Sequence, residues 1–316
     1  MLTSGMRLAL VCCVLAACFH DPAPAPAASP PARAPRVNPA VYDPLGFLPV
    51  DSEAVVAIDV NQLRASALWK ALEPTVSAKA GDALGRVRAQ CGVDLLQSVR
   101  QIAMGFRGLG DEPGPSGVFV VRGLDRKAFW PCMGHLVAAD PRVTIANDVV
   151  LVKAGPGQNP AAFTFAGAST LVAVISPTAS PEELARVIKG GAPLRASPAF
   201  LEVLGRIETQ RTAWFALNGN TKVFDKLSTL GIRPTAFSGS VDLANGFAGT
   251  ARLRLDSEDS ARNLAGLGQA QLGQVKALVD EVELLSEDAD LVFRVAMTQE
   301  QLESIAKLVG MFATGP

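Results

Sequence analysis

Cys132 and His135 are a pair of residues whose types and spacing suggest reactive chemistry. Their spacing of three residues places both side chains on one face of a helix. A thiolate beside an imidazole could act as a nucleophile with its base, and the same two groups could bind a metal. A structural zinc site needs four ligands, however, and the other histidine, His20, lies in a proline-rich stretch. We therefore predict no catalytic residue, no metal site and no cofactor.

The remaining polar patterns favour structural interpretations. The glycine-rich stretches 105–117 and 155–157 lack the Lys-Ser/Thr of a phosphate-binding loop and the strand-to-helix setting of a dinucleotide fingerprint. Arg252 and Arg254 alternate with apolar residues, as on a half-exposed face of a sheet. We interpret a third group, whose spacing does not fit an EF-hand loop, as a solvated acidic hairpin: Glu281, Glu283, Glu287, Asp288 and Asp290.

The amino-terminal residues have the layout of an export signal. Arg7 precedes an apolar run from Leu8 to Ala17, and a Pro/Ala tract follows. The run has about ten residues, whereas roughly twenty are needed to cross a bilayer. Its end, Leu15-Ala16-Ala17-Cys18, resembles the lipobox of the bacterial lipoprotein family, which has Leu three places before the cysteine and small residues between.

The resemblance to bacterial lipoproteins implies that residues 1–17 are a signal peptide and that Cys18 becomes the mature amino terminus. Cys18 would carry a diacylglyceryl thioether and an acylated amine, and several acyl chains hold a protein firmly on a membrane. Phe19 follows the cysteine in place of the Asp that retains enteric lipoproteins at the inner membrane. We therefore expect the outer membrane, with the protein facing the periplasm. The alternative is a plain secreted protein cleaved near the same place.

Two cysteines remain once the amino terminus is assigned. Cys12 and Cys13 leave with the signal peptide and Cys18 is assigned to lipid, which leaves Cys91 and Cys132. In an oxidising envelope such a pair most simply forms a disulfide. Two separately buried thiols are the alternative.

Composition predicts a folded chain with a nearly neutral surface. Of the 316 residues, 49% are hydrophobic and 19% charged, which is enough material for a core. The formal net charge is −1, and it becomes about −2 when Arg7 leaves with the signal peptide, so we expect no nucleic-acid partner. Pro and Ala dominate residues 18–40 after the lipidated cysteine, which predicts a semi-rigid tether.

The order of predicted elements repeats along the rest of the chain. We predict an α+β fold of two ferredoxin-like-related repeats (β-α-β-β-α-β-β-α), with mainly antiparallel sheets and helices packed on one face. The first unit spans residues 41–192 and the second spans residues 193–316. Strands of the first unit are expected at 54–60, 101–106, 117–121, 161–166 and 170–176, and strands of the second at 213–217, 235–243, 247–255, 282–285 and 290–297.

Local signals set the details of these units. The first unit has an additional hairpin at 143–153 around Asn147-Asp148, and the second has a hairpin around Asn245-Gly246. Pro74 is expected to separate a helix at 63–72 from one at 76–89. Ser180 and Thr298, each followed three residues later by Glu or Gln, predict capping boxes at the last helix of each unit. The folded part resembles uncharacterised envelope proteins built from duplicated α+β units.

These observations favour a lipid-anchored cell-envelope protein that acts by binding or scaffolding, and we expect that it is not an enzyme. Its partners would be the membrane, through the lipid anchor, and an envelope protein or a cell-wall polymer. Two alternatives remain open: an envelope hydrolase or redox enzyme that uses Cys132 and His135, and a lipid or small-solute carrier. The carrier would need an apolar cavity of several hundred cubic ångströms.

Overall fold

The computed structural model describes residues 44–110, 114–134, 137, 140–190, 192–219, 221–228, 231–273, 279–302 and 304. The signal peptide, Cys18, the tether and His135 lie outside these ranges. Among the helices within them, none has the length and apolar character needed to cross a membrane.

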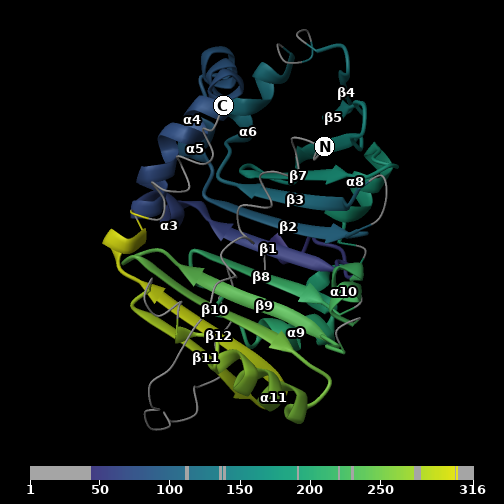
Figure 1. The fold of residues 1–316 in the computed structure, drawn as a ribbon. Helices are drawn as coiled ribbons and strands as arrows, with labels where there is room; N and C mark the ends of the chain where they lie inside the picture. Colours follow the sequence, from purple (N-terminus) through teal and green to yellow (C-terminus); the bar gives the residue numbers. More distant parts are fainter. Residues whose placement is uncertain are drawn as a thin grey trace.

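One antiparallel sheet of twelve strands runs through the whole molecule (Figure 1). Its order is β11-β12-β10-β9-β8-β1-β2-β3-β7-β6-β5-β4. The strands are β1 (Ala54–Asp59), β2 (Gln101–Arg107), β3 (Ser116–Arg122), β4 (Val143–Ala146), β5 (Val149–Val152), β6 (Ala161–Phe165), β7 (Thr170–Ile175), β8 (Ala213–Asn218), β9 (Ala236–Asp242), β10 (Phe247–Arg254), β11 (Glu281–Glu287) and β12 (Asp290–Met297).

The two halves of the chain meet where β1 pairs with β8. These strands are antiparallel, with Ala54 opposite Leu217 and Ile58 opposite Ala213. A single sheet therefore crosses the expected boundary between residues 192 and 193. The mixed α+β fold and the antiparallel pairing agree with the sequence-based prediction.

Each half contains a split β-α-β unit. Strands β10 and β11 are both antiparallel to β12, so they run parallel to each other with β12 between them, and α11 (Glu258–Gln269) connects them. Strands β3 and β6 flank β7 in the same way. The first strands of each half differ from a ferredoxin-like order, because β1 and β2 are adjacent and antiparallel.

Most other helices are short. The remaining described helices are α3 (Val60–Ala65), α4 (Ala67–Cys91), α5 (Leu95–Ser98), α6 (Arg126–Phe129), η2 (Trp130–Cys132), α8 (Pro181–Ile188), η3 (Leu194–Ala196), α9 (Pro198–Leu204), η4 (Lys222–Phe224) and α10 (Asp225–Ser228).

The break in the first helical region was predicted at the wrong place. Helix α4 continues through Pro74, and the chain breaks instead at Ser66, between α3 and α4. Proline removes one backbone donor from a helix, but the long helix on both sides retains its other bonds. Ser66 begins α4 by accepting a hydrogen bond from the backbone N–H of Trp69 at 3.1 Å, so the hydroxyl cap outweighs the proline as a boundary signal.

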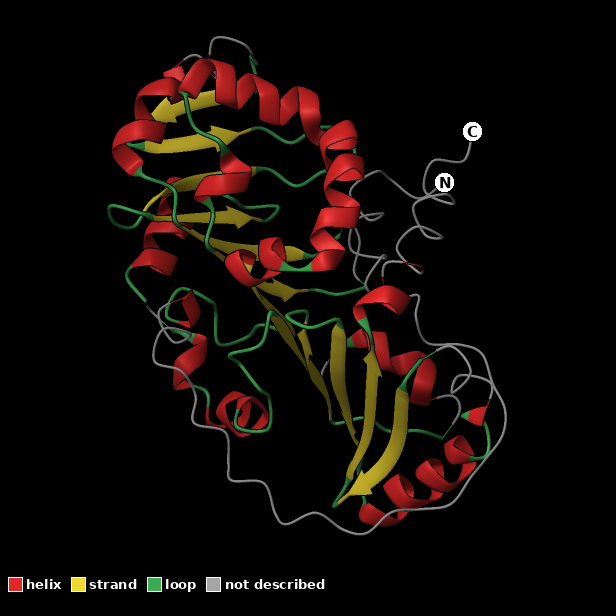
Figure 2. Ribbon diagram, turned by 90° about the vertical axis from the view of Figure 1, so that its left-hand side faces the viewer, coloured by secondary structure: helices red, strands yellow, loops and turns green. Residues whose placement is uncertain are grey.

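Helices cover both faces of the sheet, which corrects the prediction that they pack on one face (Figure 2). The alternation along β3 shows why. Val118 and Val120 belong to a core under α8 and α9, whereas Val121 packs in a second core with residues of α4 and η2. Because neighbouring side chains of a strand point to opposite faces, an apolar run such as 117–121 needs cover on both sides.

The predicted turns and caps are largely confirmed. Asn147 and Asp148 both have positive φ, at 51° and 60°, as a two-residue hairpin loop requires. At Thr298, the hydroxyl accepts from the N–H of Gln301 and the Gln301 amide accepts from the N–H of Thr298. At Ser180 only half of the capping box forms, because the Glu183 carboxylate accepts a hydrogen bond from Ser176.

Candidate functional site

Cys91 and Cys132 form a disulfide, as the sequence predicted. Cys91 ends α4, Cys132 ends η2, and their Cα atoms are 5.0 Å apart. Cys132 is buried among Val93, Phe129 and other apolar side chains in the core beneath α4. The alternative of two free thiols is therefore wrong. The bond also removes the thiolate that a nucleophile or a metal ligand at Cys132 would need.

The described residues contain no group of three or more His, Cys, Asp or Glu side chains placed to hold a metal ion. Cys18 and His135 lie outside the described ranges, so lipidation at Cys18 stays a prediction.

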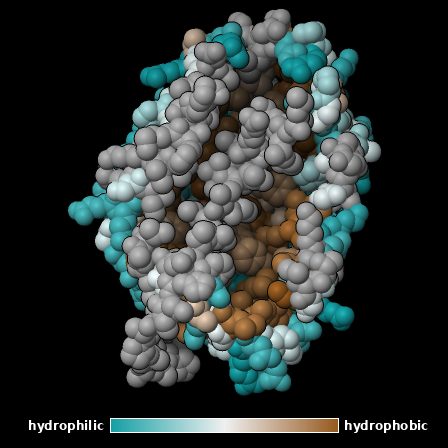
Figure 3. Space-filling view, viewed as in Figure 1, coloured by the Kyte–Doolittle hydropathy of each residue, from teal (hydrophilic) through white to brown (hydrophobic). Residues whose placement is uncertain are grey.

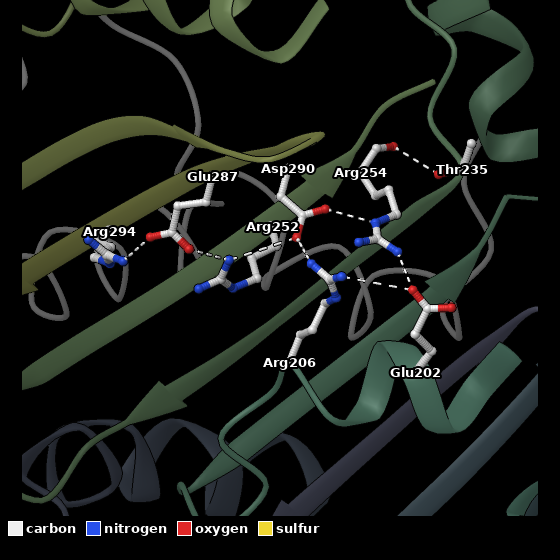
Figure 4. Close-up of polar contacts among 8 residues, drawn as sticks. All are labelled: Glu202, Arg206, Thr235, Arg252, Arg254, Glu287, Asp290 and Arg294. Atoms are coloured by element: carbon white, nitrogen blue, oxygen red, sulfur yellow. Dashed lines mark hydrogen bonds and ion pairs between the residues drawn. The ribbon is translucent and has the colours of Figure 1, made fainter. Parts of the chain in front are cut away.

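Asp290 is the centre of a buried ion-pair network (Figure 4), which the sequence analysis missed. We predicted it in a solvated hairpin, but it is 1% exposed at the start of β12. Its carboxylate accepts hydrogen bonds from Nε of Arg254 at 3.0 Å and from Nη1 of Arg206 at 2.9 Å. Arg252 Nη1 lies 3.8 Å from the same carboxylate. A buried carboxylate is stable only with such partners.

The register of the sheet explains why these side chains meet. Arg254 pairs with Asp290 across β10 and β12, and Asp290 pairs with Glu287 across β12 and β11. All three side chains therefore point to one face. The alternating charges on β10 and β11 are visible in the sequence, but the contribution of Arg206 from beyond α9 is not.

Further ion pairs extend the network in two directions. Arg254 donates to Glu202 of α9 at 2.6 Å, which ties that helix to the sheet. Arg252 donates to Glu287 at 2.7 Å. Burial alone would raise the pKa of Glu287, but the hydrogen bonds and charges of Arg252 and Arg294 lower this pKa below its ordinary value. The Glu287 carboxylate therefore keeps its charge at neutral pH.

A polar groove of about 170 Å³ lies on the same face, beside the network. Its floor includes Ser240 of β9 and Thr250 of β10, which are cross-strand partners. The other side chains of the groove lie on the loop after α9 and on strands β10, β11 and β12. They are Glu208, Arg211, Ala248, Gly249, Glu281, Arg294, Val295 and Ala296.

Ser240 points to a missing partner in this groove. The residue is 6% exposed, yet its hydroxyl makes no hydrogen bond with any residue that the structure describes. Arg252 lines the adjoining end of the groove, and its Nε atom is buried without a hydrogen-bond partner among the described residues. Buried polar groups are normally paired, so this Nε atom suits a polar partner, and the Ser240 hydroxyl is a second donor on the floor of the groove.

The opposite face of the sheet is apolar. Strand registers place eight of the fourteen phenylalanines on it, together with aliphatic residues. Figure 3 shows hydrophobic side chains at the centre of this side of the molecule and hydrophilic ones around its rim. The eight are Phe106, Phe119, Phe163, Phe165, Phe215, Phe237, Phe247 and Phe293.

Comparisons with known proteins support the fold alone. No protein-family model matches the chain, and no curated protein matches it. Among solved structures, crystal form I of TP0453 is 12% identical, with a TM-score of 0.51 over 84% of this chain and 97% of that chain. Crystal form IV of TP0453 is 11% identical, with a TM-score of 0.52 over 84% of this chain and 96% of that chain. Both agree with an α+β fold.

Removing the disulfide should destabilise the first half of the molecule. The bond closes a loop with a sequence separation of 41 residues, for which chain entropy alone gives about 4 kcal/mol. We expect the double variant Cys91→Ser, Cys132→Ser to lose most of this free energy of unfolding in urea titrations. The wild-type protein under reducing conditions is the matched control and should show the same loss. A double variant as stable as the oxidised protein would contradict the structural role.

Removing the charge of Asp290 should also destabilise the fold. In Asp290→Asn, three partly buried arginines lose their central carboxylate. We expect a loss of roughly 2–4 kcal/mol, somewhat less than for fully buried pairs because these arginines keep contact with solvent. Asp288→Asn is the matched control, since Asp288 is exposed in the adjoining turn. Equal unfolding free energies for the two variants would refute the network's role in stability.

Proposed function

We propose that this chain is a lipoprotein of the cell envelope, held on the outer membrane through Cys18, whose folded part acts by binding a polar ligand. The layout of residues 1–18 supports the anchor, and the Pro/Ala tract before residue 44 supports a spacer between lipid and fold. An oxidising compartment is consistent with the Cys91–Cys132 disulfide.

The observation that carries the binding role is the buried, unpaired Nε atom of Arg252 beside the Ser240 hydroxyl, which lies on the floor of the groove. Ser240 sits in a row of cross-strand partners that includes Thr250 and Arg294. Hydroxyl and guanidinium groups in one row can hold a ligand by several hydrogen bonds at once. Glu281 and Glu208, at the rims, add acceptors for ligand hydroxyl or amino groups.

The lining of the groove favours a hydroxyl-bearing and charged ligand over an apolar one. Four arginines and two glutamates contact the groove or its adjoining end, and the arginines are already paired with acids of the sheet. The site is therefore close to neutral and rich in hydrogen-bonding groups. Among the partners expected in the envelope, a cell-wall glycan has this chemistry, and we propose it as the ligand.

Binding without catalysis fits the state of the reactive groups. Cys132 is bonded in the disulfide, and Asp242 and Glu287, near the groove, form ion pairs with Arg211 and Arg294. The pKa of Asp242 is lowered by a hydrogen bond from the backbone of Ala244 and by Arg211, although burial acts in the opposite direction. A general acid at neutral pH would need a raised pKa.

We also propose that the two halves are copies of one unit. The strand order β1-β2-β3-β7-β6 of the first half corresponds to β8-β9-β10-β12-β11 of the second, with β4 and β5 as an added hairpin. Ser180 after β7 and Thr298 after β12 both begin helices with a hydroxyl cap. An antiparallel β1–β8 pair at the centre suits a two-fold relation between the copies.

The lipid anchor can be tested by fractionating cells that produce the chain. We expect Cys18→Ala to move the protein from the membrane pellet to the soluble fraction, because the diacylglyceryl group attaches to the Cys18 sulfur. The nearby Cys13→Ala is the matched control and should leave the protein in the pellet. A Cys18→Ala protein that remains in the membrane pellet would show that the lipid anchor is absent.

The groove can be tested by filling it. Ala248 is exposed and lines the groove, so Ala248→Trp should occupy the space of the ligand. Both proteins carry Cys18→Ala so that the lipid anchor is absent. We expect the parent protein, with its groove unmodified, to sediment with purified cell-wall material and the Ala248→Trp variant to remain in the supernatant.

Ala244→Trp is the control for this experiment, since Ala244 is exposed in the β9–β10 turn and does not line the groove. It should sediment like the parent protein. Failure of the parent to sediment, or sedimentation of Ala248→Trp at the parent's level, would exclude glycan binding in the groove.

A further inference from the structure

The two edges of the sheet differ in how they are protected. An exposed edge strand can pair with another chain, and proteins usually block such edges with charged residues. Edge strand β11 carries three acids, Glu281, Glu283 and Glu287. Edge strand β4 has the sequence Val143-Thr144-Ile145-Ala146 and carries no charge. The β4 edge therefore lacks the protection that the β11 edge has.

Strand β4 is also open to solvent. Thr144, Ile145 and Ala146 are all exposed, and Ile145, at 39%, is one of four exposed large apolar side chains in the described part of the chain. Within the described part of the chain, β4 pairs with β5 alone.

The hairpin loop determines which backbone groups of β4 face outward. The two-residue loop Asn147-Asp148 makes Ala146 and Val149 the hydrogen-bonded pair that closes the hairpin. Hydrogen-bonded and open pairs alternate in an antiparallel ladder, so Ile145, opposite Val150, directs its N–H and C=O away from β5. The bond from Lys153 N–H to the carbonyl of Arg142, at 2.9 Å, agrees with this alternation.

We propose that β4 is a self-association edge, which pairs in antiparallel fashion with β4 of a second copy about a two-fold axis at Ile145. In this register the two Ile145 residues exchange both N–H···O=C bonds, and their apolar side chains lie together. Such an isologous contact closes the edge of both sheets and joins them into one.

The charged residues near β4 favour this register over the one centred on Thr144. With Ile145 opposite Ile145 of the second copy, Arg142 lies at the end of the ladder beside the Asn147-Asp148 loop of the second copy, and the same contact occurs twice. A shift that centres the pairing on Thr144 would bring Asp140 toward that loop instead, and like charges near each other are unfavourable. Arg142 and Asp148 have side chains that are 52% and 63% exposed, so both can reach across the interface.

Arg142 can donate hydrogen bonds to two carboxylates at once. Arg142 holds Asp140 through Nε at 3.0 Å and Nη2 at 2.6 Å, while its Nη1 atom donates to no residue that the structure describes. A guanidinium has five N–H donors in a fixed plane. Asp148 similarly accepts one bond from Arg126 at 3.0 Å and retains acceptor positions. The intermolecular pair therefore needs no loss of these contacts.

Cysteine crosslinking of the full-length chain in oxidising medium tests the proposal. Ile145→Cys places two thiols opposite each other, within the Cα separation that a disulfide spans. We expect a dimer band for Ile145→Cys on non-reducing gels. The Thr144→Cys variant alone should give no such band. A mixture of Thr144→Cys and Ala146→Cys chains should restore the dimer, because those two positions face each other in the proposed register.

Charge exchange gives a second test that does not depend on thiols. Arg142→Asp should abolish the Ile145→Cys crosslink, and it should also abolish the concentration-dependent dimer that we expect light scattering to detect. The double variant Arg142→Asp, Asp148→Arg should restore both. Thermal melts establish that each variant is folded. No dimer for folded Ile145→Cys, or a stronger crosslink for Thr144→Cys alone, would overturn the proposed edge or its register.

Discussion

The antiparallel pairing of β1 with β8 is the contact on which the rest of the structure depends. It joins the strands of the two halves into one twelve-stranded sheet, so this sheet of the described residues has two faces and two edges. The core under α8 and α9 draws on both sides of this junction, with Leu184 from the first half and Trp214 from the second. Because apolar side chains from both halves are buried in this core, each half depends on the other to bury its apolar surface.

The continuous sheet separates polar and apolar functions by face. Strand alternation places Asp290, its arginines and the groove on one side of the second half, and places most phenylalanines on the other. The network holds α9 against the polar side through Glu202, and thereby shapes the loop that carries Glu208 and Arg211 beside the groove. A binding surface on rigid strands, with a supporting layer of ion pairs, needs no reactive side chain.

Local signals in the sequence predicted much of the fold. The Asn147-Asp148 loop, the Thr298 cap, the positions of the strands along the chain and the Cys91–Cys132 bond follow from short patterns or from counting cysteines. Apart from the helix break at Ser66, the misses depend on distant partners. The sequence around Asp290 suggests a solvated residue, because its partner Arg206 lies 84 residues away in the sequence. The helices on both faces of the sheet become evident only once the strands are paired. The groove was also missed, because its lining comes from five separate segments of the chain.

The central claim is that the groove beside the Asp290 network binds a polar envelope ligand. Hydrogen–deuterium exchange of the protein with and without soluble cell-wall glycan fragments tests it most directly. The account predicts slower exchange at the groove's rim, in residues 205–212 and 243–248, with β4 and β5 unchanged. Unchanged exchange at that rim, or slower exchange confined to strands distant from the groove, would contradict the account.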